Sequence, residues 1–236
     1  MIGVYDYTVV LTYLSMISGV VGITLTMVGM GHPYIGAIFL MVSGLLDAFD
    51  GRVARTKKNR TDIEKKFGTQ IDSLSDLVCF GILPAAIGVS QLRHSEIFFE
   101  LAKSKAEGGK IWILVILMTI AVGYVLTALI RLAYFNATEY ERKKEAEVTG
   151  FECFTGVPVT TAALVFPLTL IVHYYTNWDL TVFYFFLLLI VSFTFVWNIK
   201  IKKPGKAGLI VMMIVGSVEL FYVIKIIYEE GYVHFR

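Results

Sequence analysis

The sequence DAFDGRVAR at positions 47–55, followed after twelve residues by GTQIDSLSD at positions 68–76, decides the fold. Each half places carboxylates inside or at the end of an apolar segment. A carboxylate at membrane depth is costly unless a cation or a hydrogen-bonding group compensates it, and such acids usually mark functional sites. The pattern therefore predicts two membrane helices that carry a functional site.

The aspartates are spaced so that they share helix faces. Asp47 and Asp50 lie three residues apart, and Asp72 and Asp76 lie four apart, as neighbours on one side of a helix do. Because a short segment joins the two helices, they are expected to be antiparallel neighbours whose acidic faces meet. Carboxylate oxygens are ligands for Mg²⁺ and Mn²⁺, and a pair of such ions can stabilise both oxygens of a phosphoryl transfer. The four aspartates are therefore predicted to bind two metal ions.

Small and cationic residues accompany the acids. Gly51 and Ala54 place only small side chains beside the aspartates of the first helix, so that a bulky ligand can approach the backbone. Arg55 offers a planar, permanently charged fork that suits phosphate. A single membrane aspartate could be an ordinary buried hydrogen-bonding group. Four of them with Gly and Arg in register favour a site for metal and phosphate.

These residues resemble the signature of the CDP-alcohol phosphatidyltransferases, D-x2-D-G-x2-A-R-x8-G-x3-D-x3-D, and every fixed residue of it is present. The gap differs, because the twelve residues 56–67 stand where the family usually has eight. Four extra residues are about one helical turn, so the aspartate faces need not rotate. The resemblance implies a homodimer, with Asp76 as general base. It also implies a nucleotide and diphosphate site made by Gly51, Ala54, Arg55 and Gly68.

Further stretches resemble one subfamily, the phosphatidylserine synthases: QIDSLSDLVCFGILPA (70–85), IRLAYFN (130–136) and FTGVP (154–158). The resemblance implies transfer of a phosphatidyl group from CDP-diacylglycerol to L-serine, with release of CMP. Arg131 and Asn136 are then candidates to bind serine or lipid phosphate, although Arg131 could also extend to the membrane interface. The chain departs from the subfamily at Gln70, Ser75, Cys79 and Tyr134. The cation lost at position 134 bears most on acceptor recognition.

Alternative functions share parts of this pattern. An archaetidylserine synthase, which uses CDP-archaeol and serine, would carry the same stretches. Enzymes for glycerol-phosphate or inositol-phosphate acceptors usually offer extra basic residues, which are not identified in this sequence. A cation transporter lined by the aspartates is a non-enzymatic alternative, but it would not require Gly51, Ala54 and Arg55.

The composition is that of an integral membrane protein: of 236 residues, 56% are hydrophobic, and the mean hydropathy is +0.70. A net charge of +2 gives no argument for a nucleic-acid partner. The two cysteines are far apart and form no metal or redox motif. No basic segment precedes the first apolar stretch, which is therefore expected to be a permanent span rather than a cleaved signal.

Seven apolar segments predict an all-α, polytopic transmembrane helix bundle in a single domain, 1–236. The resemblance assigns about 8–206 to a six-helix core, and the last span is additional. Basic residues concentrate at 52–66, 137–149 and 199–206, which places these loops and the site on the cytosolic side of the cell membrane. The region 93–110 is expected to be a loop, with a surface helix as the alternative. The predicted spans are 8–28, 34–54, 70–90, 111–134, 158–176, 180–198 and 207–228.

Overall fold

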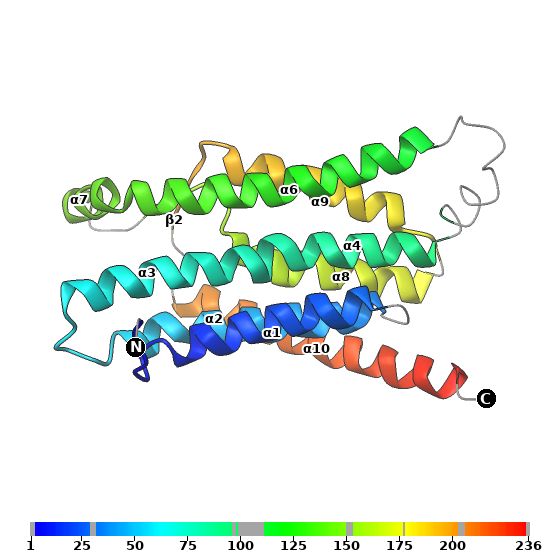
Figure 1. The fold of residues 1–236 in the computed structure, drawn as a ribbon, viewed down its shortest axis with the longest axis horizontal. Helices are drawn as coiled ribbons and strands as arrows, with labels where there is room; N and C mark the ends of the chain where they lie inside the picture. Colours follow the sequence, from blue (N-terminus) through cyan, green and yellow to red (C-terminus); the bar gives the residue numbers. More distant parts are fainter. Residues whose placement is uncertain are drawn as a thin grey trace.

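The structure is a computed structural model that describes residues 3–28, 32–95, 98, 111–149, 153–176, 178–202 and 206–234. Its long apolar helices lie side by side along the longest dimension of the molecule (Figure 1). In chain order the elements are α1 (Val10–Met27), α2 (Pro33–Ala54), α3 (Asp62–Asp76), η1 (Leu77–Ile82), α4 (Leu83–His94), α6 (Ile111–Ala137), α7 (Glu139–Thr149), β1 (Cys153–Thr155), η2 (Val159–Thr161), α8 (Ala162–Thr176), α9 (Thr181–Val196), β2 (Lys200–Lys202) and α10 (Lys206–His234).

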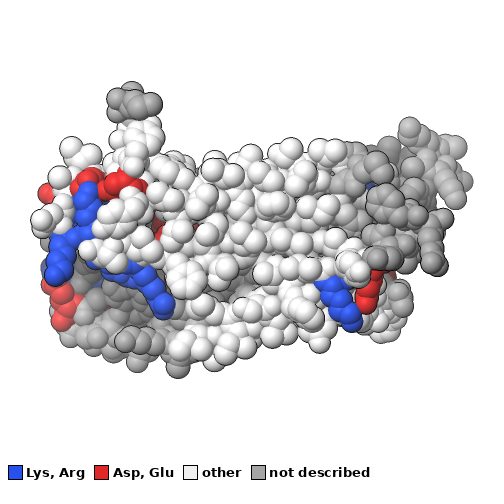
Figure 2. Space-filling view, turned by 90° about the horizontal axis from the view of Figure 1, so that it is seen from below, with Lys and Arg blue, Asp and Glu red and all other residues white. Residues whose placement is uncertain are grey.

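The helices confirm a multi-pass membrane bundle. Within the described residues, six helices are long and apolar enough to cross a membrane, and α9 is a shorter apolar helix beside them. Figure 2 shows charged side chains gathered towards the two ends of one face, with a broad uncharged belt between them. Exposed apolar side chains such as Val122 and Ile214 lie on the lipid-facing surfaces of α6 and α10. The predicted polytopic helix bundle is therefore confirmed, with six helices of spanning length among the described residues where seven spans were predicted.

Small residues bring α1 and α2 into close contact. The hydroxyls of Ser15 and Ser43 each donate to the other residue's backbone carbonyl, at 3.3 and 3.2 Å. Gly19 lies so close to η1 that a Cβ atom there would be 2.7 Å from the Sγ atom of Cys79. Small side chains and such hydrogen bonds hold helices together in lipid, where the hydrophobic effect does not. This contact fixes α1 against the half of α2 that carries the first two aspartates.

A single continuous helix runs from Asp62 to His94, with the π-helical segment η1 between α3 and α4. Pro84 has no N–H, so it cannot donate to the carbonyl of Phe80 one turn earlier. The hydroxyl of Tyr124 in α6 donates to that carbonyl instead, at 2.7 Å, and both side chains are fully buried. The central helix is thereby tied to α6 next to the segment that carries the second pair of aspartates.

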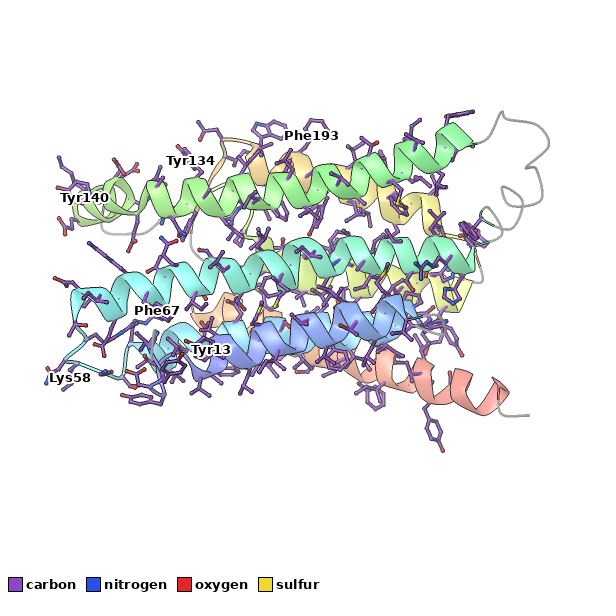
Figure 3. The ribbon with its side chains drawn as sticks, in the orientation of Figure 1. Tyr13, Lys58, Phe67, Tyr134, Tyr140 and Phe193 are labelled. Atoms are coloured by element: carbon purple, nitrogen blue, oxygen red, sulfur yellow. The ribbon has the colours of Figure 1, made fainter. Side chains whose placement is uncertain are left out.

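We expect Tyr124→Phe to lower the free energy of unfolding by about 1 kcal/mol, because the Phe80 carbonyl loses its buried partner while the ring packing is kept. Thermal unfolding in detergent measures this change. The control Tyr140→Phe alters an exposed tyrosine of α7 (Figure 3) and should leave Tm unchanged. Equal Tm values for Tyr124→Phe and the wild type would contradict the assigned role.

The predicted basic loop at 52–66 is wrong in extent. Helix α2 continues to Ala54, and α3 already begins at Asp62, eight residues before the span predicted from position 70. The reason is a capping box: the N–H of Glu64 donates to the Thr61 hydroxyl at 3.2 Å, and the N–H of Thr61 donates to Glu64 Oε2 at 2.7 Å. The connection between the two helices is therefore a short segment, residues 55–61, fixed at its end by the cap.

The loop predicted at 137–149 is instead the helix α7. Arg142 holds it against the end of α6, since its Nη1 atom donates to the Phe135 carbonyl at 2.7 Å and its guanidinium lies 3.4 Å from the centre of that ring. The region 93–110 lies largely outside the described residues, and α4 ends within it at His94.

The segment predicted as a loop at 199–206 contains β2, which pairs antiparallel with β1, Cys153 opposite Lys202. Gly156 follows β1 with a φ of +76°, and its N–H donates to the Ile199 carbonyl at 2.8 Å. A Cβ atom there would lie 2.8 Å from the carbonyl oxygen of Phe195. The FTGVP stretch therefore serves as a tight turn that leads into α8. The last helix also continues past the predicted end at 228 to His234.

Candidate active site

Three aspartates from two helices converge at one end of the bundle. Asp47 and Asp50 come from α2, Asp72 comes from α3, and each places one carboxylate oxygen within 4.8 Å of the others. Asp50 is only 8% exposed, and the Thr12 hydroxyl of α1 donates to its Oδ2 atom at 3.0 Å. Carboxylates gathered this closely in a largely buried place need a cation to balance them. An all-oxygen set of this kind fits a hard divalent ion.

Asp76 lies one helical turn after Asp72 and is not part of this set of three. It is half-buried and close enough to Asp47 and Asp72 for their charges to interact. It also interacts electrostatically with Arg131 of α6. The charge of Asp76 can therefore interact both with the acidic cluster and with a buried cation. Its predicted roles as general base and shared metal ligand stay predictions.

A cavity of about 130 Å³ opens beside Asp50 and Asp72. Three of the residues predicted to bind the nucleotide line it, but Arg55 is exposed and is not among the lining residues. The sequence did not indicate that the N-terminal segment and the start of α3 also contribute. The lining residues are Thr8, Val9, Thr12, Asp50, Gly51, Ala54, Arg60, Lys65, Gly68, Thr69 and Asp72.

The predicted acceptor residues lie on α6, facing α3. Arg131 is 7% exposed, so it does not extend to the membrane surface, and its Nε atom is buried without a hydrogen-bond partner among the described residues. Asn136 accepts a hydrogen bond from the Ser73 hydroxyl at 3.1 Å, next to Asp72 in the sequence. Tyr134 is 55% exposed and points away from the bundle (Figure 3), so the cation lost at that position would not face this site.

A second cavity, of about 150 Å³, reaches the three converging aspartates at Asp47. Asp47 lies on its wall, and the other lining residues are mainly apolar or small. Helix α10 forms one side of it, so the additional span contributes to the surroundings of the site. The lining residues are Met41, Gly44, Leu45, Asp47, Ala48, Thr160, Ala163, Leu164, Met212, Met213, Gly216, Ser217 and Leu220.

Comparison with known proteins identifies the family. A sequence model of the CDP-alcohol phosphatidyltransferases matches residues 8–197. The chain is 33% identical over 162 residues to the CDP-diacylglycerol–serine O-phosphatidyltransferase of Saccharomyces cerevisiae, covering 65% of this chain and 50% of that protein. It is 30% identical over 153 residues to the enzyme of the same name from Mycobacterium tuberculosis, covering 64% and 45%. It is 30% identical over 156 residues to the archaetidylserine synthase of Methanothermobacter thermautotrophicus, covering 65% and 53%.

The chain therefore belongs to the CDP-alcohol phosphatidyltransferase family, whose members are membrane-bound transferases of phospholipid biosynthesis. It spans about half the length of the curated relatives it matches. Membership excludes the cation-transporter alternative, because the family is one of enzymes. The matched region ends at residue 197, before α10 begins.

Proposed function

We propose that the protein transfers the phosphatidyl group of CDP-diacylglycerol to the hydroxyl of L-serine and releases CMP. The observation that carries the reaction type is the convergence of the three carboxylates from α2 and α3 beside a cavity with two cations in its wall. Serine as the acceptor is supported by the names of the relatives. It is also supported by Arg131, which is buried, has no hydrogen-bond partner for its Nε atom among the described residues, and interacts electrostatically with Asp76.

Asp47, Asp50 and Asp72 would hold the metal, as two Mg²⁺ or Mn²⁺ ions with Asp76 as a shared ligand. When bound, the ions would neutralise the diphosphate and stabilise the charge that develops on the departing CMP. The nucleotide would occupy the cavity where Gly51, Ala54 and Gly68 leave room for it, with Arg55 at its edge.

Asp76 would act as the general base. A serine hydroxyl is a weak nucleophile at neutral pH, so a proton acceptor within reach is needed. The Asp76 carboxylate takes the hydroxyl proton as the serine oxygen attacks the lipid-side phosphorus. A phosphorus–oxygen bond to serine forms, and the bond from that phosphorus to the CMP oxygen breaks. CMP leaves with the bonding electron pair.

Arg131 would bind the carboxylate of serine, with Asn136 as a hydrogen-bonding neighbour. Arg131→Gln should raise the KM for serine by about tenfold to a hundredfold, because a charge-assisted hydrogen bond to the acceptor is lost. Binding of CDP should stay close to that of the wild type. Initial rates of CMP release at varied serine concentration provide the measurement.

Two controls separate recognition from folding in this experiment. Arg131→Lys keeps a positive charge and should recover part of the serine affinity. Lys144→Gln removes an exposed cation of α7 and should change neither KM nor stability. A lower Tm for Arg131→Gln with an unchanged KM would make Arg131 a structural residue and contradict its role in binding the acceptor.

The second cavity would take a hydrocarbon chain of the donor lipid, because it is largely apolar and meets the cluster at Asp47. Either an acyl or an isoprenoid chain suits such a lining, so an archaetidylserine synthase that uses CDP-archaeol is the second candidate. The similarity to the archaeal enzyme supports including CDP-archaeol as a donor when activity is tested.

We also propose that the site faces the cytosol from a cell membrane and that the chain is a single domain acting as a homodimer. The orientation is supported by the basic residues at the end of the bundle that carries the site, between α2 and α3 and on α7. Crosslinking in native membranes tests for the dimer. Labelling of sealed cells with a membrane-impermeant reagent tests the orientation.

The proposed function is tested by CMP release from purified protein in detergent, with Mg²⁺ or Mn²⁺ present. The donors are CDP-diacylglycerol and CDP-archaeol, and the acceptors are L-serine, glycerol 3-phosphate and inositol 1-phosphate. Release that depends on serine and on metal is expected, and the preferred donor then defines the lipid. Release with a phosphorylated acceptor alone would contradict serine as the substrate.

A further inference from the structure

The cavity beside Asp50 and Asp72 is lined by two cations that lie outside the family signature. Arg60 comes from the segment between α2 and α3, and Lys65 comes from the first turns of α3. Both lie within the twelve residues that stand where the family pattern has eight. The longer segment between the two halves of the signature, residues 56–67, therefore supplies the positive charge of the cavity wall.

The Arg60 side chain is held over Gly68. Its Nη2 atom donates to the Glu64 carbonyl at 3.2 Å, and a Cβ atom added to Gly68 would lie 2.6 Å from the same nitrogen. Its Nε atom is buried and has no hydrogen-bond partner among the described residues. A buried N–H without an acceptor is unfavourable unless a ligand supplies one. The guanidinium is thus held in place through its Nη2 atom, while its Nε–H can still donate to a ligand.

The backbone that carries Arg60 is itself anchored. The ammonium of Lys57 bonds to Asp6 Oδ2 and to Glu64 Oε1, each at 2.7 Å, and so ties the N-terminal segment to the start of α3. The hydrogen bond from Lys57 lowers the pKa of Asp6 to about 2, so this contact stays ionised at neutral pH. Thr61, directly after Arg60, is the N-cap of α3. Anchors on both sides of Arg60 reduce the freedom it would lose on binding a ligand.

The charges of the cavity match a metal-bound nucleoside diphosphate. Asp50 and Asp72 would offer oxygen ligands to the ions, while Arg60 and Lys65 line the same cavity and supply positive charge for phosphate. Guanidinium groups bind phosphate through paired hydrogen bonds. We propose that Arg60 binds a phosphate group of the cytidine nucleotide, an inference that rests on the proposed function and adds a binding residue to its nucleotide site.

The test is a calorimetric titration of the purified full chain with CDP in the presence of Mn²⁺. Arg60→Gln should raise the Kd for CDP by about tenfold or more, the loss expected for a charge-assisted hydrogen bond. Arg60→Lys should give an intermediate value, because it keeps the charge without the fork. The control Lys58→Gln changes an exposed residue of the same segment, which Figure 3 shows at the end of the bundle. It should bind CDP as the wild type does.

The outcomes separate this inference from the function on which it rests. If the wild type binds CDP and Arg60→Gln binds it equally well at unchanged Tm, the role of Arg60 is wrong while the nucleotide site stands. If the wild type itself does not bind CDP with Mn²⁺, the proposed function fails, and the assignment of Arg60 fails with it. A selective loss in Arg60→Gln, with Lys58→Gln unaffected, supports the proposal.

Discussion

Asp76→Asn should lower kcat by about 10²–10⁴-fold, the range typical for loss of a general base. Asparagine has nearly the same shape as aspartate but cannot accept the proton of the serine hydroxyl. Because the set of three converging carboxylates remains in place, CDP should still bind largely as in the wild type. Single-turnover CMP release measures the chemical step, and calorimetry measures nucleotide binding in the same preparation.

The pattern of losses decides between the two roles predicted for Asp76. A loss of turnover with binding retained supports a base. A parallel loss of Mn²⁺ affinity, CDP affinity and turnover would make Asp76 a metal ligand only. Glu141→Gln, which removes an exposed carboxylate of α7, is the control for a change in charge alone and should keep full turnover.

The convergence of the aspartates was predictable because helix periodicity fixes it. Residues three or four apart share a face, and two antiparallel neighbouring helices leave few ways to bury acidic faces except against each other. Once α2 and α3 are recognised as adjacent helices, Asp47, Asp50 and Asp72 have to lie close together. The same periodicity predicted the apolar spans, since a lipid environment requires helices of a minimum length.

The place of Arg60 was not predictable, because it depends on contacts distant in sequence. Arg60 and Arg55 are equally basic residues near the end of α2, and nothing in their order along the chain says which one enters the cavity. The structure decides it through the cap of α3 and through Lys57, which bonds to Asp6 at the N-terminus. Helix α7 was missed for a related reason, because a charged helix has no apolar periodicity to reveal it.

The role of position 134 also required the structure. The sequence places Tyr134 three residues from Arg131, near enough for a shared face, yet Arg131 is buried and Tyr134 is exposed. Tertiary packing of α6 against α3 and α9 sets which side faces inward, and the sequence of an apolar helix on its own leaves that rotation open. The loss of a cation at 134 therefore does not count against serine as the acceptor.

Asp72→Asn should remove metal binding and lower kcat/KM by about 10³-fold or more, since a bound ion supplies several kcal/mol of transition-state stabilisation. Asp72 is the single member of the set of three that α3 provides, whereas Asp47 and Asp50 both come from α2. Its loss leaves a pair of carboxylates on α2 and, from the opposite helix, only Asp76, which lies outside the set of three. Mn²⁺ binding followed by electron paramagnetic resonance measures the site directly, without reference to turnover.

Asp72→Glu tests whether the charge or its position matters in this cluster. Glutamate keeps the carboxylate but extends it by one methylene group, so it should recover part of the Mn²⁺ affinity and less of the turnover. Asp72→Asn should also make CDP binding insensitive to Mn²⁺, because nucleotide and metal are expected to bind together. If Asp72→Asn binds Mn²⁺ and turns over like the wild type, the converging carboxylates are not the metal site. The divalent ion would then have to be held by other residues, and the assignment of the nucleotide cavity would lose its main support.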